Sequence, residues 1–250
     1  MKLVLSEPRL LKEGVNILFE LVNDVKIKLD PDKLEIIAMD PANVAMVIFR
    51  LLNSAFIEYD VKGAEIFCIN LESLKQVLGR SKPSDKIVLE LDNEKNRLKI
   101  SLIGDSKRTF NLGLIDLHER EQKIPELNFE GNIEMSSSSF NDAIEDMGII
   151  SDSVSLSMTK SSFLVNSMGD VNDAKVEFLN SEEVGVVLDE SKEGITSKYS
   201  VTYLKKILKG GKLSDKVFLK FGQDYPLQIE YKITDRLQFL TLLAPRVSND

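Results

Sequence analysis

The sequence has one cysteine, Cys68, and one histidine, His118, among its 250 residues. A single thiol can form neither an internal disulfide nor a cysteine-rich zinc site. Cys68 lies in an apolar run, residues 66–69, which is typical of a core position. A lone histidine in a charged segment is typical of a solvent-exposed side chain, and any Ser–His or Cys–His nucleophile would have to use it.

Long apolar runs are also missing. No window approaches the roughly 18 uninterrupted apolar residues that a membrane span needs, and residues 1–7 are too short and too soon charged for a signal peptide. We therefore expect an intracellular protein without a membrane partner. The sequence Lys209-Gly210-Gly211-Lys212 lacks the spacing and the Ser/Thr of a phosphate-binding loop.

Acidic residues outnumber basic ones, and the formal net charge is −8. This balance argues against global attraction to nucleic acid but allows a local basic surface, because salt screens charges over about 8 Å. The many carboxylates could bind catalytic metal ions, so a metal-dependent nuclease is the alternative from a different class of protein. However, Asp40, Asp116 and Asp189 show no local pattern that singles them out. The residues single out no catalytic, cofactor or metal site; that the protein is not an enzyme is what the family resemblance described below implies.

The segment 112–129 separates two halves of the chain. Its charged run, residues 118–123, contains no hydrophobe and should lie on the surface. Pro125 holds the chain extended and biases Ile124 away from helix. We interpret this segment as a linker on which Ile124 is an exposed apolar side chain.

Hydrophobic periodicity predicts the elements of the first half. Ser6 is expected to cap a helix over 9–23 with Pro8 in its first turn. The further elements expected are strands at 25–29, 34–39, 44–52, 55–59 and 64–69, a helix at 71–80, and strands at 87–91, 98–103 and 108–114.

The second half repeats this order. Ser138 or Ser139 is expected to cap a helix with Phe140, Ala143, Ile144 and Met147 on its apolar face. The other elements expected are a strand ending at 133–135, strands at 154–158 and 163–168, a helix at 201–208, and strands at 217–221, 227–233 and 237–243.

The two halves keep a nearly constant register. Leu10 matches Phe140, Leu71 matches Val201 and Ser84 matches Ser214, each 130 residues apart. This long period predicts two copies of one α+β unit, each with two helices and eight or nine strands. The expected boundaries are a domain at 1–117, a connector at 118–129 and a domain at 130–250. Two unrelated α+β domains with chance spacing are the alternative.

Several short motifs resemble the proliferating cell nuclear antigen family of DNA sliding clamps. They are Met39-Asp40-Pro41-Ala42-Asn43-Val44, Arg108-Thr109-Phe110, the connector from Leu114-Ile115-Asp116-Leu117 to Ile124-Pro125, the strand Pro226–Ile233 and the tail Leu242-Leu243-Ala244-Pro245-Arg246. Their order covers essentially the whole chain, and the tail is closer to archaeal members.

The resemblance implies a duplicated two-domain clamp fold in which each domain packs two helices on antiparallel sheets. It implies a homotrimeric ring around duplex DNA, bound without regard to sequence, that acts as a polymerase processivity factor. DNA polymerase, clamp loader, flap nuclease and ligase would bind through short peptides. The expected location is the cytoplasm at the nucleoid, or the nucleus in a eukaryote. A subunit of a heteromeric or checkpoint-type clamp is the alternative.

The resemblance places basic helix residues against DNA phosphates, where binding is electrostatic. The candidates are Arg9, Lys12, Lys75, Arg80, Lys82, Lys205, Lys206, Lys209 and Lys212. The helix from Phe140 departs from the family, because it presents Asp142, Glu145 and Asp146 and no basic residue. Either this face points partly into a subunit contact, or the channel is only patchily basic, which we favour.

Two further sites follow from the resemblance. A partner-peptide pocket would be lined by Met39, Val44, Met46, Ile124, Pro125, Pro226, Leu242, Leu243, Ala244 and Pro245. Subunits would pair through edge strands that carry Lys107, Arg108, Phe110, Leu112, Asp173, Val176, Glu177 and Phe178, with acidic residues of one strand facing Lys107 and Arg108. For most pocket residues, an ordinary place in the core is the competing interpretation.

Overall fold

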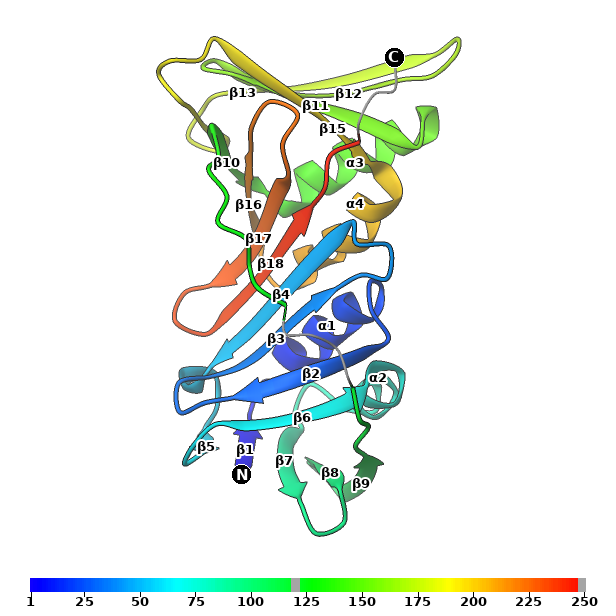
Figure 1. Ribbon diagram of the computed structural model, residues 1–250, viewed down its shortest axis with the longest axis vertical. Helices are drawn as coiled ribbons and strands as arrows, with labels where there is room; N and C mark the ends of the chain where they lie inside the picture. Colours follow the sequence, from blue (N-terminus) through cyan, green and yellow to red (C-terminus); the bar gives the residue numbers. More distant parts are fainter. Residues whose placement is uncertain (118–121, 247–250) are drawn as a thin grey trace. The chain divides into compact units, whose positions relative to one another are not determined.

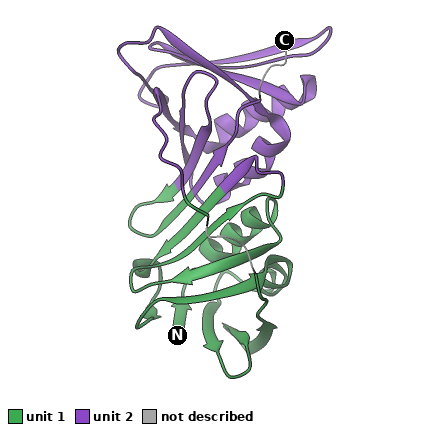
Figure 2. Cartoon of the chain, in the orientation of Figure 1, with its two compact units in different colours: residues 1–41, 47–123, 232–239 green, residues 42–46, 124–231, 240–250 purple. Residues whose placement is uncertain are grey.

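The computed structural model describes residues 1–117 and 122–246 (Figure 1). The chain forms two compact units (Figure 2). The first unit comprises Met1–Pro41, Val47–Lys123 and Lys232–Phe239, and the second comprises Ala42–Met46, Ile124–Tyr231 and Leu240–Asp250. Strands β4 (Ala45–Leu52), β17 (Leu227–Ile233) and β18 (Leu237–Leu243) therefore contribute residues to both units.

The first half of the chain runs as β1 (Lys2–Leu5), α1 (Pro8–Phe19), β2 (Asp24–Leu29), β3 (Lys33–Met39), β4 (Ala45–Leu52), the 3-10 helix η1 (Asn53–Ala55), β5 (Glu58–Asp60), β6 (Glu65–Asn70), α2 (Leu71–Gly79), β7 (Lys86–Asp92), β8 (Arg97–Ile103) and β9 (Lys107–Gly113). The second half runs as β10 (Gly131–Ser136), α3 (Ser137–Ile150), β11 (Ser153–Thr159), β12 (Ser162–Met168), β13 (Asp173–Leu179), β14 (Gly185–Leu188), β15 (Gly194–Ser200), α4 (Val201–Ile207), the 3-10 helix η2 (Leu208–Lys212), β16 (Lys216–Phe221), β17 (Leu227–Ile233) and β18 (Leu237–Leu243).

The predicted duplication is confirmed. Within the described residues each half contains two α-helices and nine strands in matching order. Strand neighbours match as well: β5-β1-β7-β8-β9 corresponds to β14-β10-β16-β17-β18, and β4-β3-β2-β6 corresponds to β13-β12-β11-β15. In these strand orders β9 corresponds to β18, and β4 corresponds to β13. The halves are therefore two copies of one α+β unit.

The core of the first unit lies between helices α1 and α2 and the sheet that they cover (Figure 1). Leu10, Ile17 and Leu18 of α1 are fully buried, and a Cβ at Gly14 would lie 2.5 Å from the Phe49 ring of β4. The glycine therefore lets α1 approach the sheet closely.

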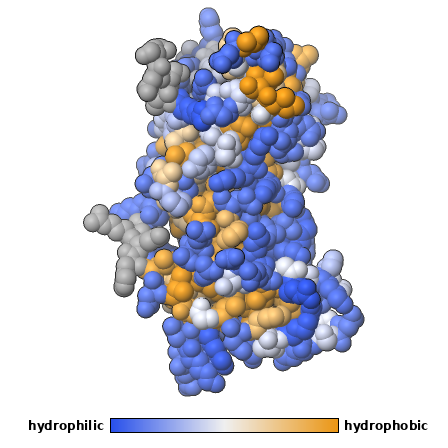
Figure 3. Space-filling model, turned by 90° about the vertical axis from the view of Figure 1, so that its right-hand side faces the viewer, coloured by the Kyte–Doolittle hydropathy of each residue, from blue (hydrophilic) through white to orange (hydrophobic). Residues whose placement is uncertain are grey.

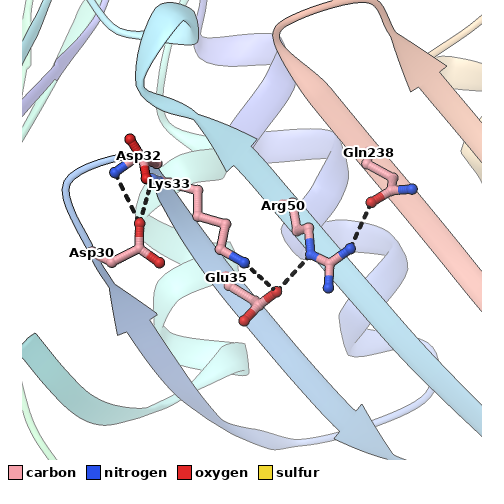
Figure 4. Close-up of polar contacts among 6 residues, drawn as sticks. All are labelled: Asp30, Asp32, Lys33, Glu35, Arg50 and Gln238. Atoms are coloured by element: carbon pink, nitrogen blue, oxygen red, sulfur yellow. Dashed lines mark hydrogen bonds and ion pairs between the residues drawn. The ribbon is translucent and has the colours of Figure 1, made fainter. Parts of the chain in front are cut away.

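Polar contacts brace the outer face of the same unit. The Asp30 carboxylate accepts hydrogen bonds from the backbone N–H groups of Asp32 and Lys33, at 2.8 and 3.0 Å, and so closes the β2–β3 turn (Figure 4). Arg50 of β4 donates to Glu35 of β3 and, at 2.9 Å, to Gln238 of β18. Arg50 thus ties β4 to its two neighbours, and Arg50 and Lys33 lower the Glu35 pKa against the opposing effect of burial.

The second unit is built around α3, α4 and a cluster of aromatic rings. Phe163 of β12 lies between Phe140 of α3 and Phe178 of β13, with ring centroids 6.2 and 6.0 Å away. Gly210 of η2 packs on Tyr231 of β17, because a Cβ there would lie 2.3 Å from the Tyr231 ring. Gly210 therefore serves packing.

Gly210→Ala is expected to destabilise the protein by about 1–3 kcal/mol, because the fully buried Tyr231 ring must move to admit a methyl group. Urea unfolding followed by circular dichroism measures this effect. Gly211→Ala is the matched control, since its Cβ would only reach ordinary contact with Ser137, at 3.4 Å. Equal losses in the two variants would mean that helix propensity, not contact with Tyr231, sets the cost.

Several local predictions are wrong. Ser6 does not cap α1, whose N-cap is Glu7 without a side-chain bond. Ser136, not Ser138 or Ser139, caps α3 and accepts from the Ser139 N–H at 3.5 Å. The strand expected at 55–59 is instead η1 followed by β5, and the helix expected through 208 ends at Ile207 and continues as η2. Strands β1, β14 and β15 were not predicted.

Candidate functional site

The candidate basic residues of the first unit lie on α1, on α2 and just beyond it. Arg9 and Lys12 belong to α1, Lys75 to α2, Arg80 is the C-cap of α2, and Lys82 follows. Lys75 Nζ lies 4.3 Å from the centroid of the Phe19 ring, which anchors its stem. Lys82 Nζ lies 3.1 Å from Asp105. The exposed pair of Lys82 with Asp105 is worth little, so Lys82 can exchange this partner for another anion.

The candidates of the second unit lie on α4 and η2. Lys205 and Lys206 belong to α4, and the exposed Lys209 and Lys212 belong to η2. Lys206 Nζ stands 5.5 Å from the centroid of the Tyr203 ring. The predicted basic residues therefore share one helical segment, with the apolar Leu204 and Ile207 buried.

Lys205 departs from the expected outward orientation. Its Nζ lies 2.7 Å from Glu145 Oε2 on α3, and a Cβ at Gly148 would come within 2.6 Å of the same atom. The Lys205 side chain thus lies against α3 at Gly148, which has no side chain to displace it. Asp142, Glu145 and Asp146 are exposed on α3. Because Glu145 pairs with Lys205, acidic side chains interrupt the basic surface, which fits a channel that is only patchily basic.

The predicted pocket residues divide by burial. Ile124, Pro125 and Ala244 are exposed, whereas Val44, Pro226 and Pro245 are half-buried. Met46, Leu242 and Leu243 are core residues, and Leu243 is fully buried. For these three the core interpretation holds. Met39 belongs to the other unit and is half-buried.

Ile124 is the most conspicuous of the exposed candidates. Its side chain is 40% accessible, and its neighbours are charged residues or proline. Farther along, the Asn128 N–H donates to Tyr225 Oη at 3.4 Å and the Phe129 ring meets the Tyr225 ring edge-on, with centroids 5.9 Å apart. The end of the connector is therefore attached next to Pro226.

Strand β15 supports two of the pocket segments, and sequence reasoning missed it. Tyr199 Oη and Ser197 Oγ both donate to the Tyr225 carbonyl, at 2.6 and 3.2 Å. The Lys198 carbonyl accepts from the Arg246 N–H at 2.7 Å. Burial raises the Tyr199 pKa well above its usual range, so the hydroxyl stays a donor. The available signal was the alternation of Ile195, Ser197 and Tyr199.

The remaining candidates lie on β9 and β13, each a seven-residue strand at a sheet edge. On β9, Phe110 and Leu112 share the half-buried face with Arg108, and Lys107 is exposed. On β13, Val176 and Phe178 share one face, and Asp173 and Glu177 lie on the exposed other. Arg108 is not free for a partner, because it donates to the buried Asp85 and, at 2.8 Å, to the Arg80 carbonyl.

Other sheet edges in the described structure are short or covered. Strands β5 and β14 have three and four residues. The Ile115 N–H donates to the Cys68 carbonyl of β6, and Gln223, Asp224 and Arg246 bond the outer edge of β15.

The face in Figure 3 is mostly hydrophilic, with apolar groups in separate areas. Exposed apolar residues lie at the end of β12, in the β12–β13 loop and at the end of β13, namely Met168, Val171 and Leu179.

His118 and residues 119–121 of the charged connector lie outside the described residues. Within the described part of the chain, no group of three His, Cys, Asp or Glu side chains could hold a metal ion. No helix there has the length and apolar character needed to cross a membrane.

Comparison with known proteins identifies the class. Residues 1–121 match the N-terminal domain of proliferating cell nuclear antigen, and residues 123–246 match its C-terminal domain. The chain therefore belongs to the proliferating cell nuclear antigen family.

Its relatives include proteins named DNA polymerase sliding clamp. The one from Nanoarchaeum equitans is 33% identical over 98% of this chain and 99% of its own length, and the one from Pyrococcus horikoshii is 34% identical over 91% and 90%. The crystal structure of the proliferating cell nuclear antigen of Thermococcus kodakaraensis superimposes with a TM-score of 0.91 at 24% identity, covering 98% of this chain and 99% of that one. This likeness confirms the fold.

Proposed function

We propose that this chain is a DNA sliding clamp, a processivity factor in which three copies close a ring around duplex DNA. The observation that carries the proposal is the pair of long uncovered edges, β9 and β13. In the strand order, β18 is the neighbour of β4, and within the first unit the Leu52 N–H donates to the Arg236 carbonyl at 3.0 Å. Since β9 and β13 are the counterparts of β18 and β4, the same pairing can join one chain to the next.

The chemistry of the two edges supports head-to-tail assembly. Lys107 is exposed on β9, and its neighbour Arg108 bonds the Arg80 carbonyl. The exposed face of β13 presents Asp173 and Glu177 with Lys175 between them. An interface that joins unlike edges of identical chains gives a ring when the rotation between neighbours closes. Exposed Met168, Val171 and Leu179 add apolar surface beside β13.

In this ring the basic residues of α1, α2, α4 and η2 would face the DNA backbone. Lysine and arginine contacts with phosphates carry no sequence information, which suits a protein that must move along DNA. A tether that is closed around its substrate needs little affinity, so the Glu145–Lys205 pair and the acidic face of α3 are compatible with this role. Asp142 and Asp146 remain candidates for a subunit contact.

Partner enzymes would bind beside the connector. A short peptide with a glutamine and apolar or aromatic anchors would contact Ile124 and Pro125 on one side and Val44, Pro226, Ala244 and Pro245 on the other. These residues are accessible, and the segments around Tyr225 and Arg246 are fastened to one strand, β15. DNA polymerase, clamp loader, flap nuclease and ligase are the expected owners of such peptides, and the chain itself performs no catalysis.

Retention on DNA tests the function directly. A clamp loaded onto a nicked DNA circle by an archaeal clamp loader and ATP should stay on the circle in high salt and leave within minutes when a nuclease linearises the DNA. Light scattering of the free protein should give three times the 28.1 kDa chain mass. A monomer at every concentration would indicate a heteromeric clamp, and equal retention on circular and linear DNA would contradict topological binding.

A further inference from the structure

The last described residues of the chain are held at both ends. The Ala244 N–H donates to the Val44 carbonyl at 2.9 Å, and the Arg246 N–H donates to the Lys198 carbonyl of β15 at 2.7 Å. Ala244 and Arg246 are nevertheless exposed, and Pro245 is half-buried. The tail thus lies over the surface, attached by few contacts and with little burial of its own.

A side-chain pair reinforces this attachment. Arg246 Nη1 and Nη2 donate to Asp152 Oδ1 and Oδ2, at 2.9 and 2.8 Å. This bidentate geometry gives an arginine–carboxylate pair direction as well as strength. The Arg246 hydrogen bonds lower the Asp152 pKa, so the pair stays charged at neutral pH.

Asp152 is itself well placed as an anchor. It lies in the short connection between α3 and β11, and its carbonyl accepts from the N–H of Val201, the first residue of α4, at 3.0 Å. Its backbone is therefore fixed by two neighbouring elements. The exposed Asp152 carboxylate provides an attachment point to which the tail can bind or from which it can separate.

We propose that the Asp152–Arg246 pair is a latch that holds the tail on β15 and thereby positions Ala244 and Pro245 as one wall of the partner-peptide pocket. This inference rests on the proposed function of that pocket. Arg246 and Asp152 are positioning residues and do not contact the peptide. A tail that is ordered in advance spares the peptide the entropy cost of ordering it on binding.

The same strand sets the opposite wall. Tyr199 holds the Tyr225 carbonyl, and the adjacent residue, Lys198, holds Arg246. The spacing between the Tyr225–Pro226 wall and the Ala244–Pro245 wall is therefore fixed by neighbouring residues of β15 while the latch is closed. When the latch opens, only the backbone bonds to the Val44 and Lys198 carbonyls hold the tail, and the Ala244–Pro245 wall is less firmly positioned.

Two measurements on the full-length protein test the latch. Hydrogen exchange of the Ala244 and Arg246 amides reports the tail itself, and fluorescence polarisation of a labelled synthetic peptide with a glutamine and apolar and aromatic anchors reports the pocket. Asp152→Asn should speed exchange and weaken peptide binding by about fivefold, the effect expected of one exposed charged pair. Arg246→Lys should be intermediate, and the exchanged pair Asp152→Arg with Arg246→Asp should restore both.

Two reference variants separate the possible failures. Glu134→Gln removes another exposed ion pair of the same unit, the one with Lys216, and should change neither readout. Ile124→Asp should abolish peptide binding without altering tail exchange. Unchanged exchange in Asp152→Asn would overturn the latch, and faster exchange with unchanged affinity would overturn its positioning role. A peptide affinity insensitive to Ile124→Asp would overturn the pocket itself and the inference that rests on it.

Discussion

Phe110→Glu is expected to convert the ring into single chains. Phe110 lies at the middle of the edge strand β9, on the half-buried face that would meet Val176 and Phe178 of the next chain. A carboxylate buried there without a partner costs about 3–5 kcal/mol at each interface. Light scattering at several concentrations should show the mass fall from three times 28.1 kDa to 28.1 kDa.

The control for this variant is Asn111→Glu, which adds the same charge to the same strand on its exposed face. It should assemble far better than Phe110→Glu. The disassembled variant should keep its far-ultraviolet circular dichroism spectrum and should no longer be retained on circular DNA. A Phe110→Glu protein that still forms trimers would show that β9 is not the assembly edge.

Arg108→Met is expected to destabilise each chain by about 3–5 kcal/mol, because it leaves a buried carboxylate without its counter-charge. Asp85 is only 1% exposed and accepts from the Lys82 N–H at 2.8 Å as well as from Arg108. Gly104 packs against the same carboxylate, where a Cβ would collide with it. Urea unfolding in the Phe110→Glu background measures the loss without a contribution from assembly.

Arg97→Met gives the comparison. Arg97 pairs with Asp92 at 3.0 Å, but both side chains are about one-third exposed. Water can therefore replace the lost partner, and the free energy of unfolding should fall far less than in Arg108→Met. If the two substitutions cost the same, the burial of Asp85 would not be what makes its pair important.

Most elements of the fold were predictable because their burial follows a simple period. Strand β2 alternates buried Val25, Ile27 and Leu29 with half-buried lysines, and α1 buries one apolar stripe. Strand β15 was missed because its buried face contains Ser197 between Ile195 and Tyr199, and a buried serine looks polar in a sequence. Strand β1 was missed because its four residues are mostly buried, without alternation.

The candidate site was predictable only in part. Exposure of Ile124 followed from its charged neighbours, which the sequence displays directly. The burial of Met46 and Leu243 could not be predicted from the sequence. At the start of β4 and the end of β18 consecutive residues are buried, and this lack of alternation arises from tertiary packing. The engagement of Arg108 with Asp85 was equally hidden, since the partners are far apart in sequence and meet only when β9 packs near the end of α2.

The covering of the other strand edges has a consequence for how the protein behaves in a crowded cell. An exposed strand edge accepts almost any extended chain, so each one left open invites fibrils or mispaired oligomers. Here the tail and the β16–β17 turn cap β15, Ile115 partly covers β6, and β5 and β14 are short. Among the described strands, β9 and β13 are the long edges that remain open to pairing, and the two strands differ in sequence. A newly made chain therefore offers few strand edges for incorrect pairing. By keeping the tail over the edge of β15, the Asp152–Arg246 latch would also reduce aggregation.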